Sequence, residues 1–288
     1  MTDLSLDTIS SLTGGFDGTY DVACPLCGPD RRSPANRRRK VLRIWIVDGF
    51  STYCCQRCGE HGYVRDQTAA RPDPEVLARI RAEAAERERA AAAERLSKAK
   101  WLWSQRRPLA GSIAEVYLRA ARAYSGALPT TLGFLPPRGE HGPAMVAAFG
   151  LCQEPEPGML HIHDVDIAGV HITRLSQDGS GKAGTNADKI MVGRSAGKPI
   201  ILAPANDLLG LAITEGIEDA LSVHQATGLG VWAAGCGSRM PPLADLVPSY
   251  VECVTIYAHA DDTGQKGARK LALALADRVE VFVEGLLQ

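Results

Sequence analysis

The sequence predicts a multidomain protein of mixed α/β and α+β class. Three observations lead to this prediction: two Cys-x-x-Cys pairs near the N-terminus, a long Ala-, Glu- and Arg-rich stretch after them, and apolar runs that alternate with helix-like segments near the C-terminus. They predict a zinc ribbon at residues 1–70, a helical connector at 71–107, an α+β subdomain at 108–207 and a doubly wound, mostly parallel sheet at 208–288.

The composition is that of a globular protein. The 288 residues are 45% hydrophobic and carry a formal net charge of −1, and this length allows two or three domains. No apolar run approaches the length that spans a membrane, and the N-terminus lacks the basic and apolar regions of a secretory signal, so we expect a cytoplasmic protein without membrane partners. Eight cysteines in such a chain favour metal binding over disulfides.

Four regularly spaced cysteines form the N-terminal motif. Two Cys-x-x-Cys knuckles can place four thiolates tetrahedrally around one zinc ion, and the alternating apolar residues at 41–47 between them are typical of a strand. Cys54 and His61 are weaker candidates, because Cys54 must point away from its neighbour on a strand and His61 lies beyond the second knuckle. The alternative is a set of buried, reduced cysteines. The predicted zinc ligands are Cys24, Cys27, Cys55 and Cys58.

Cations are concentrated between the two knuckles. A small metal-held module cannot bury so many charges, and such a face attracts the phosphate backbone of nucleic acid. A solvated loop that keeps the module soluble is the alternative. The cations are Arg31, Arg32, Arg37, Arg38, Arg39, Lys40 and Arg43, and those from Arg37 to Lys40 are the predicted nucleic-acid-binding set.

Residues 72–107 are rich in Ala, Glu and Arg and have proline near both ends, which predicts one long helix. Pairs such as Glu75 with Arg79 lie one turn apart and support it. We interpret this helix as a solvated connector, with a nucleic-acid-binding arm as the alternative. Trp101 and Trp103 near its end indicate the beginning of a packed domain.

The stretch 108–207 has α+β character. A capped helix is predicted at 112–118, and two strands at 159–165 and 169–175 are predicted to be joined by a turn. Basic residues in and after the second strand lie upstream of the acidic motifs described next, where they could bind nucleotide or template. Isolated, solvated side chains are the alternative. The candidates are Arg174, Lys182 and Lys189.

Acidic residues follow two apolar runs in the C-terminal part. The run at 211–214 leads into Glu215, with Asp219 one helical turn later, and the run at 254–258 is followed by Asp261 and Asp262. The carboxyl ends of parallel strands line the ligand crevice of an open sheet, so these carboxylates are expected to converge. Clustered carboxylates need a cation, and hard oxygen ligands suit magnesium. The site is therefore expected to act on phosphate.

The pattern Glu-Gly-x-x-Asp-Ala at 215–220, followed by a strand and His-x-Asp-x-x-Gly at 259–264, resembles the Toprim domain of bacterial-type primases, topoisomerases and some nucleases. The resemblance covers residues 208–284. It implies a metal-binding Glu after the first strand, here Glu215, and a later Asp-x-Asp pair. Only the second Asp of that pair is present, as Asp261, and His259 stands in place of the first. An ordinary doubly wound domain with exposed acidic loops is the alternative.

The N-terminal module is similar to the zinc-binding module of bacterial and phage primases. The similarity lies in the order Cys-Pro-x-Cys, Ser-Pro, strands and Tyr-Cys-Cys-x-x-Cys-Gly between residues 24 and 59. In that family the first knuckle commonly ends in His, and here it ends in Cys27. The stretch 108–207 resembles the subdomain that precedes Toprim in phage- and plasmid-type primases.

These resemblances imply a DNA primase of phage or plasmid type, which makes primers for replication by template-directed nucleotidyl transfer. Mg²⁺ or Mn²⁺ bound by Glu215 and Asp261 would position the triphosphate, with Asp219 as a further catalytic candidate and His259 and Asp262 as further metal ligands. The implied partners are single-stranded DNA, nucleoside triphosphates and a separate replicative helicase, since no helicase domain follows. A Toprim nuclease and a non-catalytic recombination mediator with a zinc finger and a Toprim domain are the alternatives.

Overall fold

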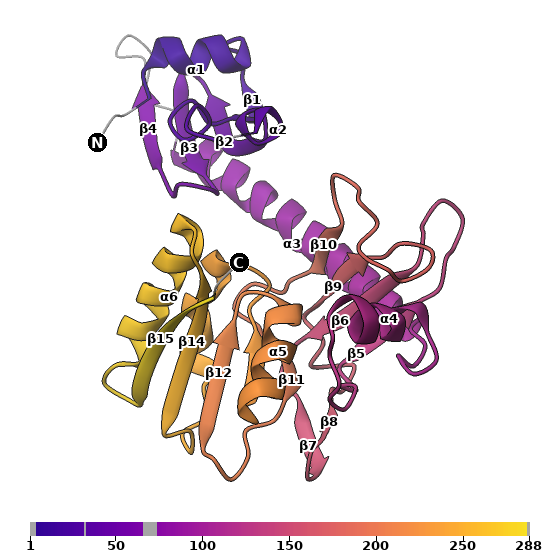
Figure 1. The fold of residues 1–288 in the computed structure, drawn as a ribbon. Helices are drawn as coiled ribbons and strands as arrows, with labels where there is room; N and C mark the ends of the chain where they lie inside the picture. Colours follow the sequence, from indigo (N-terminus) through magenta and orange to yellow (C-terminus); the bar gives the residue numbers. More distant parts are fainter. Residues whose placement is uncertain (1–3, 32, 66–73, 287–288) are drawn as a thin grey trace. The chain divides into compact units, whose positions relative to one another are not determined.

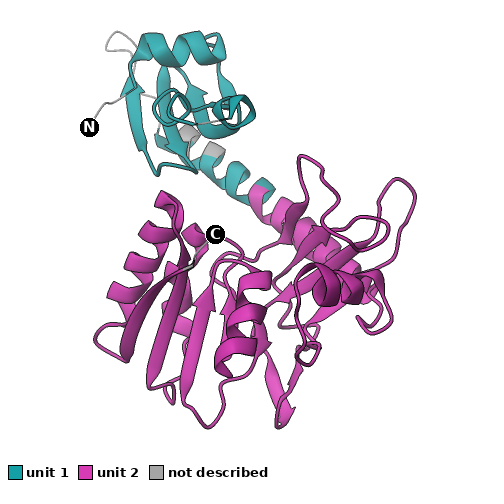
Figure 2. Cartoon of the chain, in the orientation of Figure 1, with its two compact units in different colours: residues 1–87 teal, residues 88–288 magenta. Residues whose placement is uncertain are grey.

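The computed structural model describes residues 4–31, 33–65 and 74–286 (Figure 1). They form two compact units, residues 1–87 and 88–288 (Figure 2). The division falls within helix α3 (Pro74–Ser104), which makes up most of the predicted connector. Residues 71–73 of that connector and Arg32 of the basic stretch lie outside the described residues. No described helix is long and apolar enough to cross a membrane. The domain boundaries at 70, 107 and 207 stay predictions.

Unit 1 is built on a four-stranded antiparallel sheet. Its elements are α1 (Leu6–Thr13), β1 (Gly18–Ala23), α2 (Pro34–Arg37), β2 (Lys40–Val47), β3 (Phe50–Cys55) and β4 (His61–Arg65), and the strand order is β1-β2-β3-β4. Alternate residues of β2, such as Leu42 and Ile44, are buried on one face and share a core with Ile9 of α1. Asp48 and Gly49 join β2 to β3 with φ angles of 48° and 72°, the conformation of a tight hairpin turn.

Unit 2 begins with an α+β part. Its elements after α3 are α4 (Ile113–Val116), the π-helical segment η1 (Tyr117–Ala121), β5 (Leu132–Leu135), β6 (Ala144–Phe149), β7 (Gln153–Glu156), β8 (Met159–His161), β9 (Gly169–Arg174) and β10 (Lys189–Gly193). The sheet has the antiparallel order β10-β9-β6-β5. Trp103 of α3 is buried in a core with residues of this sheet, so the chain enters a packed domain where the sequence predicts it.

The two strands predicted at 159–165 and 169–175 correspond to β8 and β9, and a turn at 163–166 lies between them, as the sequence predicts. β8 pairs with β7, whereas β9 lies between β6 and β10. Ile162 and Ile167, on either side of that turn, are buried in the core that contains Trp103. The turn itself is exposed, and the N–H of Asp166 donates to the carbonyl of His163 at 2.9 Å. The two strands next to the turn therefore pair with other strands and not with each other.

The rest of unit 2 is a five-stranded α/β sheet. Its elements are β11 (Ile200–Ala203), β12 (Gly210–Thr214), α5 (Ile217–Thr227), β13 (Gly230–Ala233), η2 (Gly237–Arg239), η3 (Pro241–Leu246), β14 (Cys253–His259), α6 (Asp262–Leu275) and β15 (Glu280–Leu286). The order is β11-β13-β12-β14-β15, with β11 antiparallel to β13 and the other pairs parallel. Ala212 shares a core with α5, and its neighbours Leu211 and Ile213 share one with α6. The two helices therefore cover opposite faces, and the predicted fold class is confirmed.

Helix α6 packs on η2 through glycine backbones, which gives a stability prediction. A methyl group at Gly267 would overlap the carbonyl oxygen of Gly237, and because this neighbour is backbone, relieving the overlap requires a shift of α6 or η2. We expect Gly267→Ala to cost about 3 kcal/mol, or a fall of roughly 6–10 °C in melting temperature for a unit of this size. Thermal unfolding measures it. Gly285→Ala is the control, since a methyl group there meets no atom within 4 Å; equal melting temperatures of the two variants would contradict the prediction.

Candidate functional site

The four predicted zinc ligands come together in unit 1. Cys24 and Cys27 follow β1, Cys55 ends β3, and Cys58 lies in the turn after it. Their four Sγ atoms lie within 4.8 Å of one another, and the Sγ atoms of Cys27 and Cys55 are 3.9 Å apart. Zinc–sulfur bonds of about 2.3 Å in a tetrahedron separate the sulfurs by roughly 3.8 Å. The cluster therefore fits a zinc ion.

Each knuckle is closed by its own backbone. The N–H of Gly28 donates to the carbonyl of Cys24 at 2.9 Å, and the N–H of Gly59 donates to the carbonyl of Cys55 at 3.0 Å. Burial raises the pKa of the Cys27 thiol to about 12, so the thiolate needs a compensating cation. Cys54 is outside the cluster, because consecutive side chains of β3 point to opposite faces of the sheet and Cys55 points to the cluster.

The predicted nucleic-acid-binding residues of unit 1 lie beside the first knuckle. Arg37 ends α2, Arg38 caps it, and residues 39 and 40 lead into β2, all four being exposed. A methyl group at Gly28 would lie 3.1 Å from the carbonyl oxygen of Arg37, which places the basic segment against the knuckle. Arg57 of the second knuckle donates to the carbonyl of Asn36 in α2 at 3.0 Å. Arg57 thus adds a cation to this surface that the sequence did not single out.

In unit 2 the acidic motifs meet at one edge of the parallel sheet. Glu215 directly follows β12, and His259 is the last residue of β14, the strand that pairs with β12 (Figure 1). Asp219 lies in the first turn of α5. Asp261 is the N-cap of α6, and the exposed Asp262 is the first residue of that helix. Both acidic motifs therefore lie at the carboxyl ends of neighbouring strands.

His259 connects these groups. Its backbone N–H donates to Oε1 of Glu215 at 3.2 Å, and its Nε2 lies 2.9 Å from Oδ2 of Asp219. The hydrogen bond with Asp219 raises the pKa of His259. The negative charges of Asp219, Glu215 and Asp261 add to this rise, and partial burial opposes it. The imidazole therefore faces the carboxylate site.

The carboxylates leave oxygen atoms for a cation. Oδ1 of Asp261 accepts the N–H groups of Thr263 at 2.9 Å and Gly264 at 2.8 Å. Oδ2 of Asp261 and Oε2 of Glu215 have no hydrogen bond with any residue that the structure describes. No three of the acidic and histidine groups at this edge lie within 4.8 Å of one another. One or two carboxylates with several waters is the usual environment of Mg²⁺, so the residues fit that ion. A methyl group at Gly264 would overlap Oε1 of Glu215, which explains a glycine at this position.

A buried ion cluster adjoins this edge and includes a residue that the sequence did not single out. Glu218, in the first turn of α5, pairs with Lys189 at 2.9 Å and with Lys182 at 3.5 Å. Burial alone would raise the pKa of Glu218, but the two lysines outweigh it and lower that pKa to about 2. Arg174, the third predicted nucleotide-binding residue, lies on β9, and no hydrogen bond or ion pair joins its side chain to Glu218.

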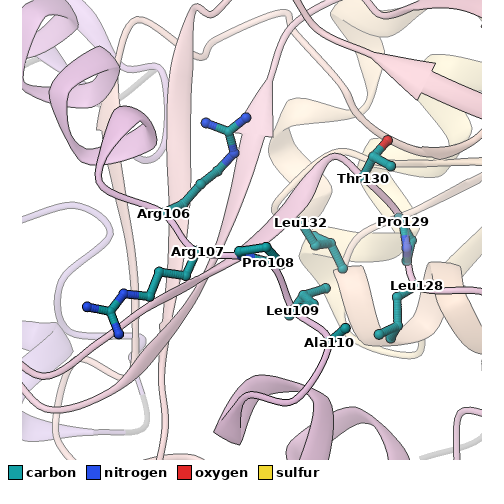
Figure 3. A pocket seen from close by; sticks show the side chains of 9 residues that line it. All are labelled: Arg106, Arg107, Pro108, Leu109, Ala110, Leu128, Pro129, Thr130 and Leu132. Atoms are coloured by element: carbon teal, nitrogen blue, oxygen red, sulfur yellow. The ribbon is translucent and has the colours of Figure 1, made fainter.

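A separate pocket of about 470 Å³ lies between the end of α3 and the start of β5 (Figure 3). The guanidinium groups of Arg106 and Arg107 extend away from apolar side chains such as Leu109 and Leu128. The Arg106 guanidinium instead stacks 3.9 Å from the ring centre of Trp103. None of the predicted site residues lines this pocket, so it is distinct from the carboxylate site.

Comparisons with known proteins identify two regions. Residues 210–283 match the Toprim domain, and residues 93–202 match a family described as a domain of unknown function (DUF7146). No curated protein matches the chain. A solved structure with a similar chain is that of the Aquifex aeolicus primase, zinc-binding and RNA polymerase domains, at 16% identity and a TM-score of 0.43, covering 98% of this chain and 77% of that one. The C-terminal part of the chain is therefore a Toprim domain, which confirms the resemblance drawn from its motifs.

Proposed function

We propose that this Toprim protein is a primase-type nucleotidyltransferase that makes primers on single-stranded DNA. The observation that carries the proposal is the meeting of Glu215, His259 and Asp261 at one sheet edge, next to the lysine pair held by Glu218. Anionic ligands for a cation beside fixed ammonium groups suit a magnesium-bound triphosphate. The cysteine cluster and basic segment of unit 1 support the proposal, because a template strand is also a phosphate polymer.

Each group of residues has a separate role in the proposed reaction. Mg²⁺ or Mn²⁺, when held by Glu215 and Asp261, supplies charge neutralisation for the triphosphate and the pyrophosphate leaving group. Lys182 and Lys189 bind and orient the phosphates of the incoming nucleotide. Asp219 fixes the imidazole of His259 through their 2.9 Å contact. Residues 37–40 of unit 1 hold the template through its backbone, and a separate helicase supplies that template in single-stranded form.

A single incubation tests the proposal. The purified chain is mixed with a labelled single-stranded template, differently labelled nucleoside triphosphates, and Mg²⁺ or Mn²⁺. We expect short products that form only when template and metal are both present. Shortened template without new products would indicate a nuclease. A template mobility shift with neither change would indicate a DNA-binding recombination mediator, and either outcome would refute the primase proposal.

His259 gives a prediction for metal preference. An aspartate there adds a negative charge beside Glu215, and two unit charges roughly 4 Å apart at an effective dielectric constant of about 20 interact by about 4 kcal/mol before desolvation offsets it. We expect His259→Asp to bind Mg²⁺ about tenfold more tightly and to raise Mg²⁺-dependent activity. The pKa of His259 is raised above its ordinary value of about 6.5. Its protonation should therefore begin to weaken metal binding by the wild type at pH values above about 6.5.

Calorimetric titration with Mg²⁺ and Mn²⁺ between pH 6 and 7.5 measures both effects. The aspartate variant should have a flatter pH profile and less preference for Mn²⁺, because imidazole is a better ligand for Mn²⁺ than for Mg²⁺. His141→Asp serves as the control, since His141 is exposed and lies outside the Toprim domain. If His259→Asp matched the wild type in both affinity and pH profile, His259 would have no part in metal binding.

A further inference from the structure

Glu218 is a nearly buried carboxylate with three partners. Its side chain is 10% exposed. Oε2 accepts from Nζ of Lys189 at 2.9 Å, and Oε1 accepts from the hydroxyl of Tyr117 at 2.9 Å and lies 3.5 Å from Nζ of Lys182. A buried carboxylate is stable only when such partners replace its lost water, so the position of Glu218 is closely defined.

The cluster joins the two parts of unit 2. Glu218 belongs to the Toprim domain, whereas Lys182, Lys189 and Tyr117 belong to the preceding region at 93–202. Tyr117 lies in the π-helical segment η1, a local distortion that is frequent at functional sites. Its hydroxyl also accepts from Nε of Arg122 at 3.0 Å. Two lysines thus contact the carboxylate directly, and Arg122 approaches it through Tyr117, so the cations of this cluster outnumber Glu218.

The lysines keep donors for a further anion. Each ammonium group has three N–H donors, and Glu218 takes one from each. The lysine side chains are 30% and 36% exposed, so the remaining donors can reach a ligand from solvent. Asp219, the next residue of α5, is turned to His259 at the metal-binding edge. The same helical turn therefore carries both the residue that holds the ammonium groups and the residue that contacts His259.

We propose that Glu218 is a positioning residue, which fixes Lys182 and Lys189 to bind the triphosphate of the incoming nucleotide. This inference rests on the proposed function. A lysine side chain is long and flexible, and a tethered ammonium group loses less freedom when it binds phosphate. The N-terminus of α5 adds to the attraction through the helix dipole, and no side chain of its N-cap, Gly216, caps the first turn.

Binding of inorganic triphosphate to the full chain in the presence of Mg²⁺ tests this role without catalysis. Glu218→Gln keeps the shape and removes the charge, and we expect the dissociation constant to rise about tenfold, as in Lys189→Met. Adding Glu218→Gln to the double variant Lys182→Met/Lys189→Met should weaken binding by no more than about twofold further, because Glu218 acts through the two lysines. In primer synthesis Glu218→Gln should raise KM for nucleotide about tenfold and change kcat less than threefold. Glu88→Gln is the control, since Glu88 pairs with Arg95 in α3.

Three results would overturn the inference. Unchanged triphosphate affinity in a folded Glu218→Gln variant would leave Glu218 a purely structural role. Tighter binding would mean that Glu218 screens the lysines from phosphate. Wild-type protein that binds no triphosphate would remove the site itself.

A second variant covers the case in which Glu218→Gln does not fold. Tyr117→Phe removes only the hydroxyl that orients Glu218, and it should raise the dissociation constant about threefold. Wild-type affinity in that variant would also overturn the inference. Failure of the proposed function is distinguishable, because Glu218-dependent triphosphate binding without any primer synthesis would uphold this role and reject the primase.

Discussion

Replacing Cys55 and Cys58 together by serine is expected to remove zinc and to unfold residues 4–65, while unit 2 keeps its fold. The cysteines are part of the core of unit 1, where Cys24, Cys27 and Cys55 pack with Leu42 and Ile44. A unit this small buries only a modest fraction of its surface. Structural zinc in small domains contributes on the order of 10 kcal/mol to folding. Two remaining thiolates cannot supply tetrahedral coordination, so both the metal and its contribution are lost.

Elemental analysis and hydrogen exchange measure the two consequences. Zinc should fall from about one ion per chain to less than about 0.1, and peptides from residues 4–65 should lose protection while those from unit 2 keep it. Cys54→Ser is the matched control, because Cys54 points away from the cluster and its loss should leave both readouts unchanged. Full zinc occupancy in the double serine variant would show that the metal is held elsewhere.

The cluster of four cysteines could be predicted from the sequence, because the residues that define it are close together in the chain. Each knuckle spans four residues, and the alternation of β2 sets which side chains face the core. The same alternation separates Cys54 from Cys55, so a ligand could be rejected by periodicity alone. The acidic motifs could also be predicted from the sequence, since each directly follows an apolar strand.

Glu218 could not be predicted, because its partners are distant in sequence. Lys189 is 29 residues away and Tyr117 is 101 residues away, and no spacing rule connects them. The contact between His259 and Asp219, across 40 residues, likewise depends on the parallel pairing of β12 and β14. The partners of β8 and β9 could not be predicted either, since alternating polarity identifies a strand and does not identify the strand it pairs with.

Replacing Glu215 by glutamine is expected to reduce nucleotidyl transfer about a thousandfold, corresponding to about 4 kcal/mol, with DNA binding changed less than about twofold. The amide oxygen can still accept the N–H of His259, so the loop geometry at the end of β12 should persist. What is lost is the charge on the other carboxylate oxygen, which has no hydrogen bond with any described residue and which we propose to hold a cation. The loss should therefore fall on metal-dependent chemistry and spare the cationic surfaces that we propose to bind DNA.

Single-turnover primer synthesis and a DNA mobility shift, measured on the same preparations, separate these effects. Glu252→Gln is the matched control: this exposed carboxylate precedes β14 at the opposite end of the strand from His259, and its loss should leave both readouts at the wild-type level. Synthesis by Glu215→Gln at the wild-type rate would exclude the Toprim edge as the catalytic centre. Parallel loss of synthesis and DNA binding would instead indicate a misfolded sheet, which hydrogen exchange of β12 and β14 can detect. Loss of synthesis alone, in a variant that binds DNA and keeps those strands protected, is the result that a metal-binding role for Glu215 requires.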